Sequence, residues 1–310
     1  MQLPYLDAPT MTGTLSWHEV IDALANAIRS LPPGVPPVAR VGVPVAAGEL
    51  LLMPGQTASA VGVKVVGVAP GNPDQNLPRI QGVFILMDAP TLTPIALMDG
   101  TALTNIRTPG LSALAVRELA SRQAKRLVVF GSGPQARAHI AAVCSVRPLE
   151  SLRIVARNPL GVAALLAELD GTSLDARAGT PADAVDADIV VCATTARTAV
   201  FDGSLLAEHA CVIAVGSHEP DAREVDDIVF GRASRVVVED RETALREAGD
   251  VIQAISAGAL DVGSLLDLRS VVVSRPSTDG ISVFKSVGMA WQDLAIAEAI
   301  WAVSPRSGRH

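Results

Sequence analysis

The feature that most constrains the fold of this chain is a glycine-containing turn that joins an apolar run to a helical segment. The apolar run is Leu127–Phe130, and it is followed by a turn that matches the dinucleotide fingerprint Gly-x-Gly-x-x-Gly/Ala. In such a turn the first glycine permits the sharp bend, the second lets the backbone approach a pyrophosphate, and the small third residue permits close packing of helix on strand. The helix N-terminus also offers free N–H groups to phosphates. The sequence therefore predicts a cofactor site formed by Gly131, Ser132, Gly133, Pro134, Gln135 and Ala136.

An ordinary strand–helix turn that uses glycine only for its geometry is the alternative. The surrounding sequence favours the cofactor site, because strand and helix patterns alternate from about residue 119 onwards. Short β-branched apolar runs suit buried parallel strands, which we expect at Arg126–Phe130, Leu152–Ala156, Ile189–Ala193, Cys211–Val215 and Arg235–Val238. Helices are expected at Pro134–Val146 and Leu160–Leu169. We therefore predict an α/β protein with a Rossmann-type doubly wound parallel sheet in residues 119–286.

The first 118 residues show no such alternation. They are rich in proline and glycine and contain short strand patterns at Val61–Val68 and Val83–Met87, which indicates an α+β domain. A helix is expected over Trp17–Leu31, because Ser16 and Glu19 form a capping-box pair at its start. The helical segment Val287–Val303 lies far beyond the sheet strands, so we expect residues 287–310 to return to the first domain. Residues 1–118 with 287–310 are the predicted substrate-binding and dimerisation domain.

Composition excludes several classes of function. Hydrophobic residues make up 49% and charged residues 18% of the chain, which is typical of a folded protein with a sizeable core. The net charge is −7 and no basic cluster exceeds two adjacent residues, so we expect neither nucleic-acid nor membrane-surface binding. No apolar run approaches the roughly 18 residues that span a bilayer, and the first residues lack a secretory-signal pattern.

The three cysteines, Cys144, Cys192 and Cys211, lack metal-ligand spacing, so no metal site is expected. Two of them lie in apolar runs and are expected to be buried thiols. A reducing cytoplasm is the simplest compartment for such a chain.

The end of the second expected strand bears on the choice of dinucleotide. An acidic residue there accepts the ribose 2′-hydroxyl of NAD, whereas an arginine suits a 2′-phosphate. This strand instead ends in Arg157-Asn158, whose side chains can both donate to a phosphate. The sequence thus favours NADP(H), with NAD(H) possible. Alternatively, Arg157 lies at a strand end in solvent.

Sparse cations in the first domain indicate a carboxylate site. Lys64 is one of three lysines and lies inside the apolar run Val61–Val68, so it either faces solvent from a strand or is buried with a partner. Burial would lower its pKa and suit it to proton transfer. Arg40 and Arg107 could bind a carboxylate bidentately. The alternative is that these three residues are scattered surface cations.

Motifs along nearly the whole chain resemble the ornithine cyclodeaminase/mu-crystallin family. The combination of Leu103-Thr104-x-x-Arg107-Thr108 with Gly131-x-Gly133-x-Gln135-Ala136-x-x-His139 is the most specific part of the resemblance. The other matching motifs, in the family's order, are Met53-Pro54-Gly55, Gly62-Val63-Lys64, Leu77-Pro78, Gln81-Gly82 and Phe284-Lys285-Ser286-Val287-Gly288.

The resemblance implies a homodimer in which each chain has a substrate domain and a Rossmann domain. It implies that Arg40 and Arg107 bind the substrate carboxylate, and that Lys64 contacts the substrate and serves in proton transfer. The resemblance also places further residues at the cofactor, namely Thr194, Thr195, Ser286, Val287 and Gly288. His139 is implied to be structural, near the cofactor loop. Asp293 either bonds across domains or lies on a solvated helix face.

One departure from the family pattern bears on the reaction. Ornithine cyclodeaminases and the related alanine dehydrogenases carry an aspartate where this chain has His218. A histidine titrates near pH 6.5 and is a weaker or repulsive partner for an ammonium substrate. We therefore expect an NAD(P)H-dependent reductase of cyclic imino acids, with Lys64 and His218 as candidate proton donors. The alternatives are an ornithine cyclodeaminase with bound NAD, and a catalytically silent protein that binds NADPH or a small ligand.

A second departure follows the motif Leu103–Thr108. Pro109-Gly110 replaces the two alanines frequent in the family. We expect this pair to reshape the start of the helix that follows Arg107.

Overall fold

The computed structural model describes residues 3–31, 38–57, 59–274 and 277–304. The chain divides into two compact units, Met1–Thr108 with Gly288–His310, and Pro109–Val287. Helix α3 (Gly100–Leu119) begins in the first unit and ends in the second, so the boundary lies inside one helix. Pro109 lies inside this helix, which continues through it. The expectation that a helix starts after Arg107 is therefore wrong. Within the described residues, no helix is long and apolar enough to cross a membrane.

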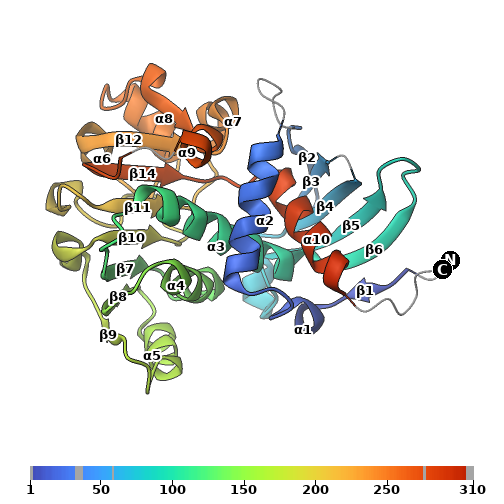
Figure 1. Cartoon of the computed structure of the whole chain (residues 1–310), viewed down its shortest axis with the longest axis horizontal. Helices are drawn as coiled ribbons and strands as arrows, with labels where there is room; N and C mark the ends of the chain where they lie inside the picture. Colours follow the sequence, from blue (N-terminus) through green and yellow to red (C-terminus); the bar gives the residue numbers. More distant parts are fainter. Residues whose placement is uncertain (1–2, 32–37, 58, 275–276, 305–310) are drawn as a thin grey trace. The chain divides into compact units, whose positions relative to one another are not determined.

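The second unit contains an eight-stranded parallel sheet in the order β13-β12-β14-β11-β10-β7-β8-β9 (Figure 1). From β7 the chain proceeds to β8 and β9 on one side and then crosses to β10 and β11 on the other, which is doubly wound topology. The α/β class predicted from the sequence is confirmed. The strands are β7 (Arg126–Phe130), β8 (Ser151–Val155), β9 (Asp175–Ala178), β10 (Ile189–Cys192), β11 (Cys211–Ala214), β12 (Ala233–Val238), β13 (Leu265–Asp267) and β14 (Ile281–Lys285).

Helices pack against these strands within the same unit. Helix α4 contacts β7 and β10, and α6 contacts β12 and β14. Strands β10 and β11 are buried at every position, which explains their continuous β-branched and apolar sequences. The helices of this unit, besides the end of α3, are α4 (Pro134–Val146), α5 (Pro159–Glu168), α6 (Asp227–Arg232), α7 (Arg241–Glu247), α8 (Gly249–Ser256) and α9 (Leu268–Ser274).

The first unit contains a six-stranded sheet in the order β1-β6-β5-β4-β3-β2. All neighbouring strands are antiparallel except β1, which runs parallel to β6. The strands are β1 (Tyr5–Leu6), β2 (Val41–Val45), β3 (Gly48–Gln56), β4 (Ala60–Val68), β5 (Ile80–Asp88) and β6 (Pro94–Asp99), and the helices are α1 (Ala8–Met11), α2 (Trp17–Ser30) and α10 (Ala290–Val303).

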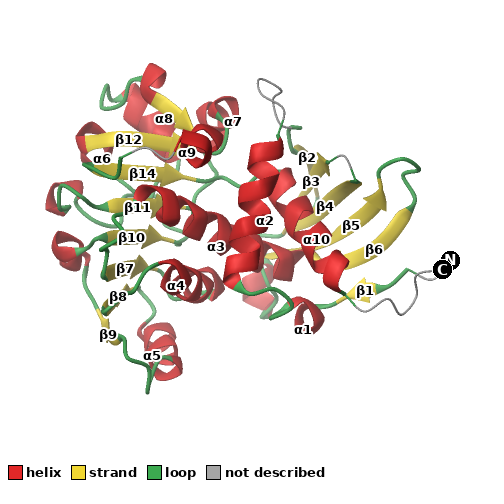
Figure 2. Ribbon diagram, in the orientation of Figure 1, coloured by secondary structure: helices red, strands yellow, loops and turns green. Residues whose placement is uncertain are grey.

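Helices α2 and α10 pack side by side, and α10 contacts β3, β4 and β5 (Figure 2). The predicted capping box at the start of α2 is present, because Glu19 accepts from the backbone of Ser16 while its own N–H bonds the serine hydroxyl. Positions alternate between buried and partly exposed along β4, and Lys64 is one of the buried positions. The same sheet face that packs against α10 therefore carries the lysine.

Candidate functional site

Lys64 lies buried in the first unit with a carboxylate partner. Its Nζ is 2.8 Å from Oδ2 of Asp293 and donates to Oγ1 of Thr104 at 3.1 Å. The side chains of Lys64 and Asp293 are 3% and 0% exposed, respectively. The solvent-facing alternative for Lys64 is therefore wrong, and so is the solvated helix face for Asp293, whose two partners lie in its own unit.

Arg107 extends this cluster. Its Nε is 3.4 Å from Oδ1 of Asp293, and its Nη1 donates to Oε1 of Gln292 at 2.7 Å. The guanidinium lies against Gly288, since a Cβ at that glycine would be 2.9 Å from both Nη atoms. Arg40 donates from Nη2 to the carbonyl of Gly288 at 3.1 Å. The structure thus brings both predicted arginines to Gly288.

Charge in this cluster favours an anion. Burial lowers the pKa of Lys64 to about 8, the nearby Asp293 carboxylate opposes that shift, and the charges of Arg107 and Arg40 add to it. Lys64 is therefore mostly protonated at pH 7. Two cations, Lys64 and Arg107, then contact the single carboxylate of Asp293, so these three side chains carry a net positive charge that suits a carboxylate ligand.

Sequence reasoning did not assign three members of the cluster to the site, namely Thr104, Gln292 and Asp293. Thr104 could have been found, because it lies three residues before Arg107 on one helix and therefore on the same face. No local sequence pattern indicates the pairing of Lys64 with Asp293, because Lys64 lies in β4 and Asp293 lies in α10, near the other end of the chain.

In the second unit, the glycine turn is sharply bent at its first glycine and has open space at its second. Gly131 has φ +119°, and a Cβ there would lie 2.5 Å from the carbonyl oxygen of Ala193. Its N–H donates to the carbonyl of Val155 at 2.8 Å, which joins the turn to the end of β8. Gly133 is the N-cap of α4 without a side-chain cap, and a Cβ on it would meet nothing within 4 Å. The start of α4 thus has space at Gly133 for a phosphate group to approach the helix N-terminus.

The ends of β7 and β8 bring Ser132 and Asn158 close together. A Cβ at Gly161 would lie 2.6 Å from Oγ of Ser132 and 3.3 Å from Nδ2 of Asn158. Oδ1 of Asn158 accepts from the N–H of Leu160 at 3.1 Å and caps α5, so its amide nitrogen is the end that can donate to a ligand. Arg157 is exposed and makes no ion pair with any residue in the described part of the chain.

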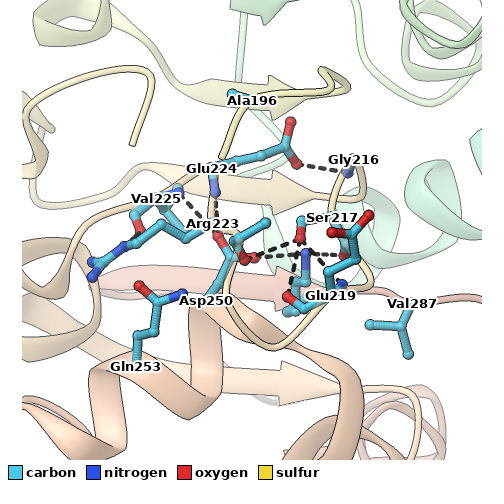
Figure 3. A network of polar contacts seen from close by, with 12 residues as sticks. Ala196, Gly216, Ser217, Glu219, Arg223, Glu224, Val225, Asp250, Gln253 and Val287 are labelled. Atoms are coloured by element: carbon cyan, nitrogen blue, oxygen red, sulfur yellow. Dashed lines mark hydrogen bonds and ion pairs between the residues drawn. The ribbon is translucent and has the colours of Figure 1, made fainter. Parts of the chain in front are cut away.

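The loops after β10 and β11 are joined by the buried carboxylate of Glu224, whose contact with Gly216 is seen in Figure 3. Oε1 of Glu224 accepts from the N–H and the hydroxyl of Thr194 at 2.7 and 2.8 Å, and Oε2 accepts from the N–H of Gly216 at 2.6 Å. Thr194 is half-buried and Thr195 is exposed. His218 is exposed on the loop after β11.

Segment 286–287 is held by Glu239, the residue that directly follows β12. Oε1 of Glu239 accepts from the hydroxyl of Ser286 at 2.9 Å, and Oε2 accepts from the N–H of Val287 at 2.8 Å. Two successive residues of the predicted cofactor site are therefore fixed by one carboxylate. Gly288 follows directly but belongs to the first unit.

His139 supports the glycine turn from within the core. Its Nδ1 is 2.7 Å from the carbonyl of Gln135, which can only accept, so Nδ1 carries the proton. Nε2 then accepts from the hydroxyl of Ser112 at 2.8 Å. Burial lowers the pKa of His139 to about 4. The neutral imidazole thus connects the first turn of α4 to α3.

We predict that His139 makes stability pH-dependent. The folded pKa of about 4 lies below the ordinary value of 6.5, so the stabilisation is complete above pH 6.5 and is lost as pH falls towards 4. The unfolding free energy lost in total is about 3 kcal/mol. Urea unfolding of the wild type and His139→Asn at pH 7, 6, 5 and 4 measures it: their difference in unfolding free energy should shrink with falling pH. Substitution of the exposed His18 by Asn is the control, and a pH-independent difference at position 139 contradicts the assignment.

Comparison with known proteins gives one consistent result. The family model described as "Ornithine cyclodeaminase/mu-crystallin family" matches residues 6–304. The Delta(1)-pyrroline-2-carboxylate reductase of Bacillus cereus is 33% identical over 268 residues, covering 83% of this chain and 82% of the relative. The structure of the Thermococcus litoralis Delta(1)-pyrroline-2-carboxylate reductase in complex with NADH and L-proline has a TM-score of 0.89 and 31% identity, covering 97% of each chain. An archaeal alanine dehydrogenase dimer with bound NAD has a TM-score of 0.89 and 25% identity, covering 98% of this chain and 96% of that one. This chain belongs to the ornithine cyclodeaminase/mu-crystallin family.

Proposed function

We propose that this protein is an NAD(P)H-dependent reductase of cyclic 2-imino carboxylates. The substrate class is pyrroline-2-carboxylate, reduced to L-proline, with the six-membered piperideine-2-carboxylate and its product L-pipecolate as the second member. The cluster of Lys64 and Arg107 on Asp293, with Arg40 at Gly288, carries the proposal, because it combines carboxylate-binding groups with a buried proton donor. The names of the bacterial relative and of the Thermococcus structure support it.

The arginines have the role of fixing the substrate. Arg107 is oriented by Gln292 and Asp293, and Arg40 by the carbonyl of Gly288. Two guanidinium groups held in this way can bind one carboxylate and so fix the imine carbon next to it. Asp293 is bound to both Lys64 and Arg107, so it also fixes the lysine relative to the carboxylate site.

Lys64 has the role of proton donor. Reduction of the imine adds a hydride to the carbon and a proton to the nitrogen, and protonation makes the carbon electrophilic. When bound, the nicotinamide supplies the hydride. Lys64 gives a proton from Nζ to the imine nitrogen and becomes a neutral amine, which its buried position tolerates. His218 is the second candidate donor, on the exposed loop after β11.

We assign the cofactor to the second unit and to the residue that follows it. Its proposed site consists of Gly131, Ser132, Gly133, Pro134, Gln135, Ala136, Arg157, Asn158, Thr194, Thr195, Ser286, Val287 and Gly288. The open N-terminus of α4 supports pyrophosphate binding there. The exposed Arg157 and the donating amide of Asn158 support a preference for NADP(H) over NAD(H).

We also propose that the protein is a homodimer that associates through the first unit. The sheet face opposite Lys64 is largely apolar. Neighbouring strands contribute Leu52, Val65, Val83 and Asp99 at one register level and Pro54, Val63, Ile85 and Leu97 at the next. At its edge, Val41, Val43 and Leu50 are 51%, 41% and 38% exposed. An apolar face of this extent is typical of a protein interface. The archaeal relative, which is a dimer by its description, supports this assembly.

We predict that Lys64→Met lowers kcat for pyrroline-2-carboxylate reduction by on the order of 100-fold or more, as loss of a general acid does. In the wild type, kcat/KM should fall above about pH 8, where Lys64 loses its proton, and the variant should lack this decline. Steady-state kinetics from pH 6 to 10 measure both effects. The exposed Lys125, substituted by Met, is the matched control. Unchanged catalytic efficiency in Lys64→Met would remove this lysine from the mechanism.

We predict that Arg157→Ala raises the KM for NADPH by on the order of 10-fold and leaves the KM for NADH unchanged, because only NADPH carries the 2′-phosphate. Initial rates with each cofactor at saturating imine measure this. Arg177→Ala, on the exposed strand β9, is the control. An equal change for both cofactors contradicts the assignment of Arg157.

We predict that Val43→Asp combined with Leu50→Asp converts the dimer to monomers. The two residues face each other across β2 and β3, so paired carboxylates would repel each other and oppose burial at an interface. Light scattering after size exclusion gives the mass, and circular dichroism confirms folding. Val185→Asp, at an exposed position in the second unit, is the control. A double variant that remains dimeric excludes this face.

A further inference from the structure

The second unit contains a buried lysine that the proposed mechanism does not use. Lys285 ends β14, and its Nζ is 2.7 Å from Oδ2 of Asp250 in the first turn of α8. Both side chains are 0% exposed. Removing one partner of such a pair leaves an uncompensated charge in the core, so the two groups hold each other in place.

Lys285 also reaches the loop that carries His218. Its Nζ donates at 2.7 Å to the carbonyl of Ser217, which is the peptide group directly before His218. The hydroxyl of Ser217 donates to the carbonyl of Ala222 at 3.0 Å and so closes the loop on itself. The lysine therefore fixes the backbone from which the His218 side chain extends.

Asp250 fixes the other end of the same loop. Its Oδ1 accepts from the N–H groups of Glu224 and Val225 at 2.6 and 3.0 Å (Figure 3). The loop packs directly on the start of α8, since a Cβ at Gly249 would lie 2.1 Å from the carbonyl oxygen of Ala222 and 2.4 Å from that of Glu219. Only glycine fits there. One ion pair thus holds the loop of residues 216–225 at both ends.

The pair also lies next to the segment assigned to the cofactor. Lys285 is followed by Ser286 and Val287, whose positions are fixed by Glu239, directly after β12. The ammonium group of Lys285 therefore donates a hydrogen bond to the loop that carries His218, while the backbone of Lys285 continues directly into segment 286–287. A displacement of the lysine would change the position of one relative to the other.

We propose that Lys285, paired with Asp250, is a positioning residue that fixes the His218 loop relative to segment 286–287. This inference rests on the proposed function, in which segment 286–287 belongs to the cofactor site and His218 is the second candidate proton donor. Lys285 acts through Ser217 and touches neither substrate nor cofactor.

The test uses the full-length protein with both charges removed together, Lys285→Met with Asp250→Asn, because the single Lys285→Met variant leaves a buried carboxylate unpaired. An asparagine can still accept from the backbone of Glu224 and Val225 through its carbonyl oxygen. Lys125→Met with Glu150→Gln removes an exposed ion pair of the same unit and is the matched control. Hydrogen exchange of peptides covering residues 216–225 measures how well the loop is ordered. Steady-state kinetics of imine reduction measure the effect of a less ordered loop on kcat.

We expect faster exchange in the loop with unchanged exchange in β7, and a kcat lower by on the order of 10-fold to 100-fold, as for a misplaced catalytic group. His218→Ala should lower kcat in the wild type but cause little further loss in the double variant, because residues that act as a unit are not additive. A structural defect alone would give additive losses.

Unchanged loop exchange, unchanged kcat or additive losses would each overturn the positioning role. A wild type that reduces no cyclic imine contradicts the proposed function instead, and the exchange measurement then decides alone whether Lys285 orders the loop.

Discussion

The proposed chemistry depends on the buried ion pair between Lys64 and Asp293. A lysine in the middle of an apolar strand would be strongly destabilising without a partner, and the carboxylate 2.8 Å away stabilises its charged form. Burial nevertheless lowers its pKa to about 8, which places the group where it can release a proton near neutral pH. Because Asp293 also contacts Arg107, the acid and the carboxylate-binding group are fixed together.

The second unit repeats this arrangement at Lys285. There a fully buried ammonium is paired with Asp250, but its remaining contact is a backbone carbonyl. In our proposals the lysine–aspartate pair at β4 serves proton transfer and the pair at β14 fixes the backbone. The two lysines differ in their second contact, which is the hydroxyl of Thr104 for Lys64 and the carbonyl of Ser217 for Lys285.

Much of the fold could be predicted from local patterns. Strand β7 and helix α4 begin and end at the expected residues, because apolar runs and helix-start signals are local. Strand β9 was not predicted, since its sequence Asp-Ala-Arg-Ala lacks the apolar residues of a buried strand and it lies at the sheet edge. Arg40, Lys64 and Arg107 were identified as candidates, but Asp293 and the pair of Lys285 with Asp250 were not. Their partners are far apart in the sequence, and only the folded chain brings them together.

The most direct test of the account is a comparison of substrates for the wild-type protein. Initial rates are measured with pyrroline-2-carboxylate, piperideine-2-carboxylate and L-ornithine, each with NADPH and with NADH. We expect the cyclic imines to be reduced with stoichiometric oxidation of the cofactor, and L-ornithine not to be consumed. Consumption of L-ornithine alone, with release of ammonia and no net oxidation of the cofactor, would contradict it.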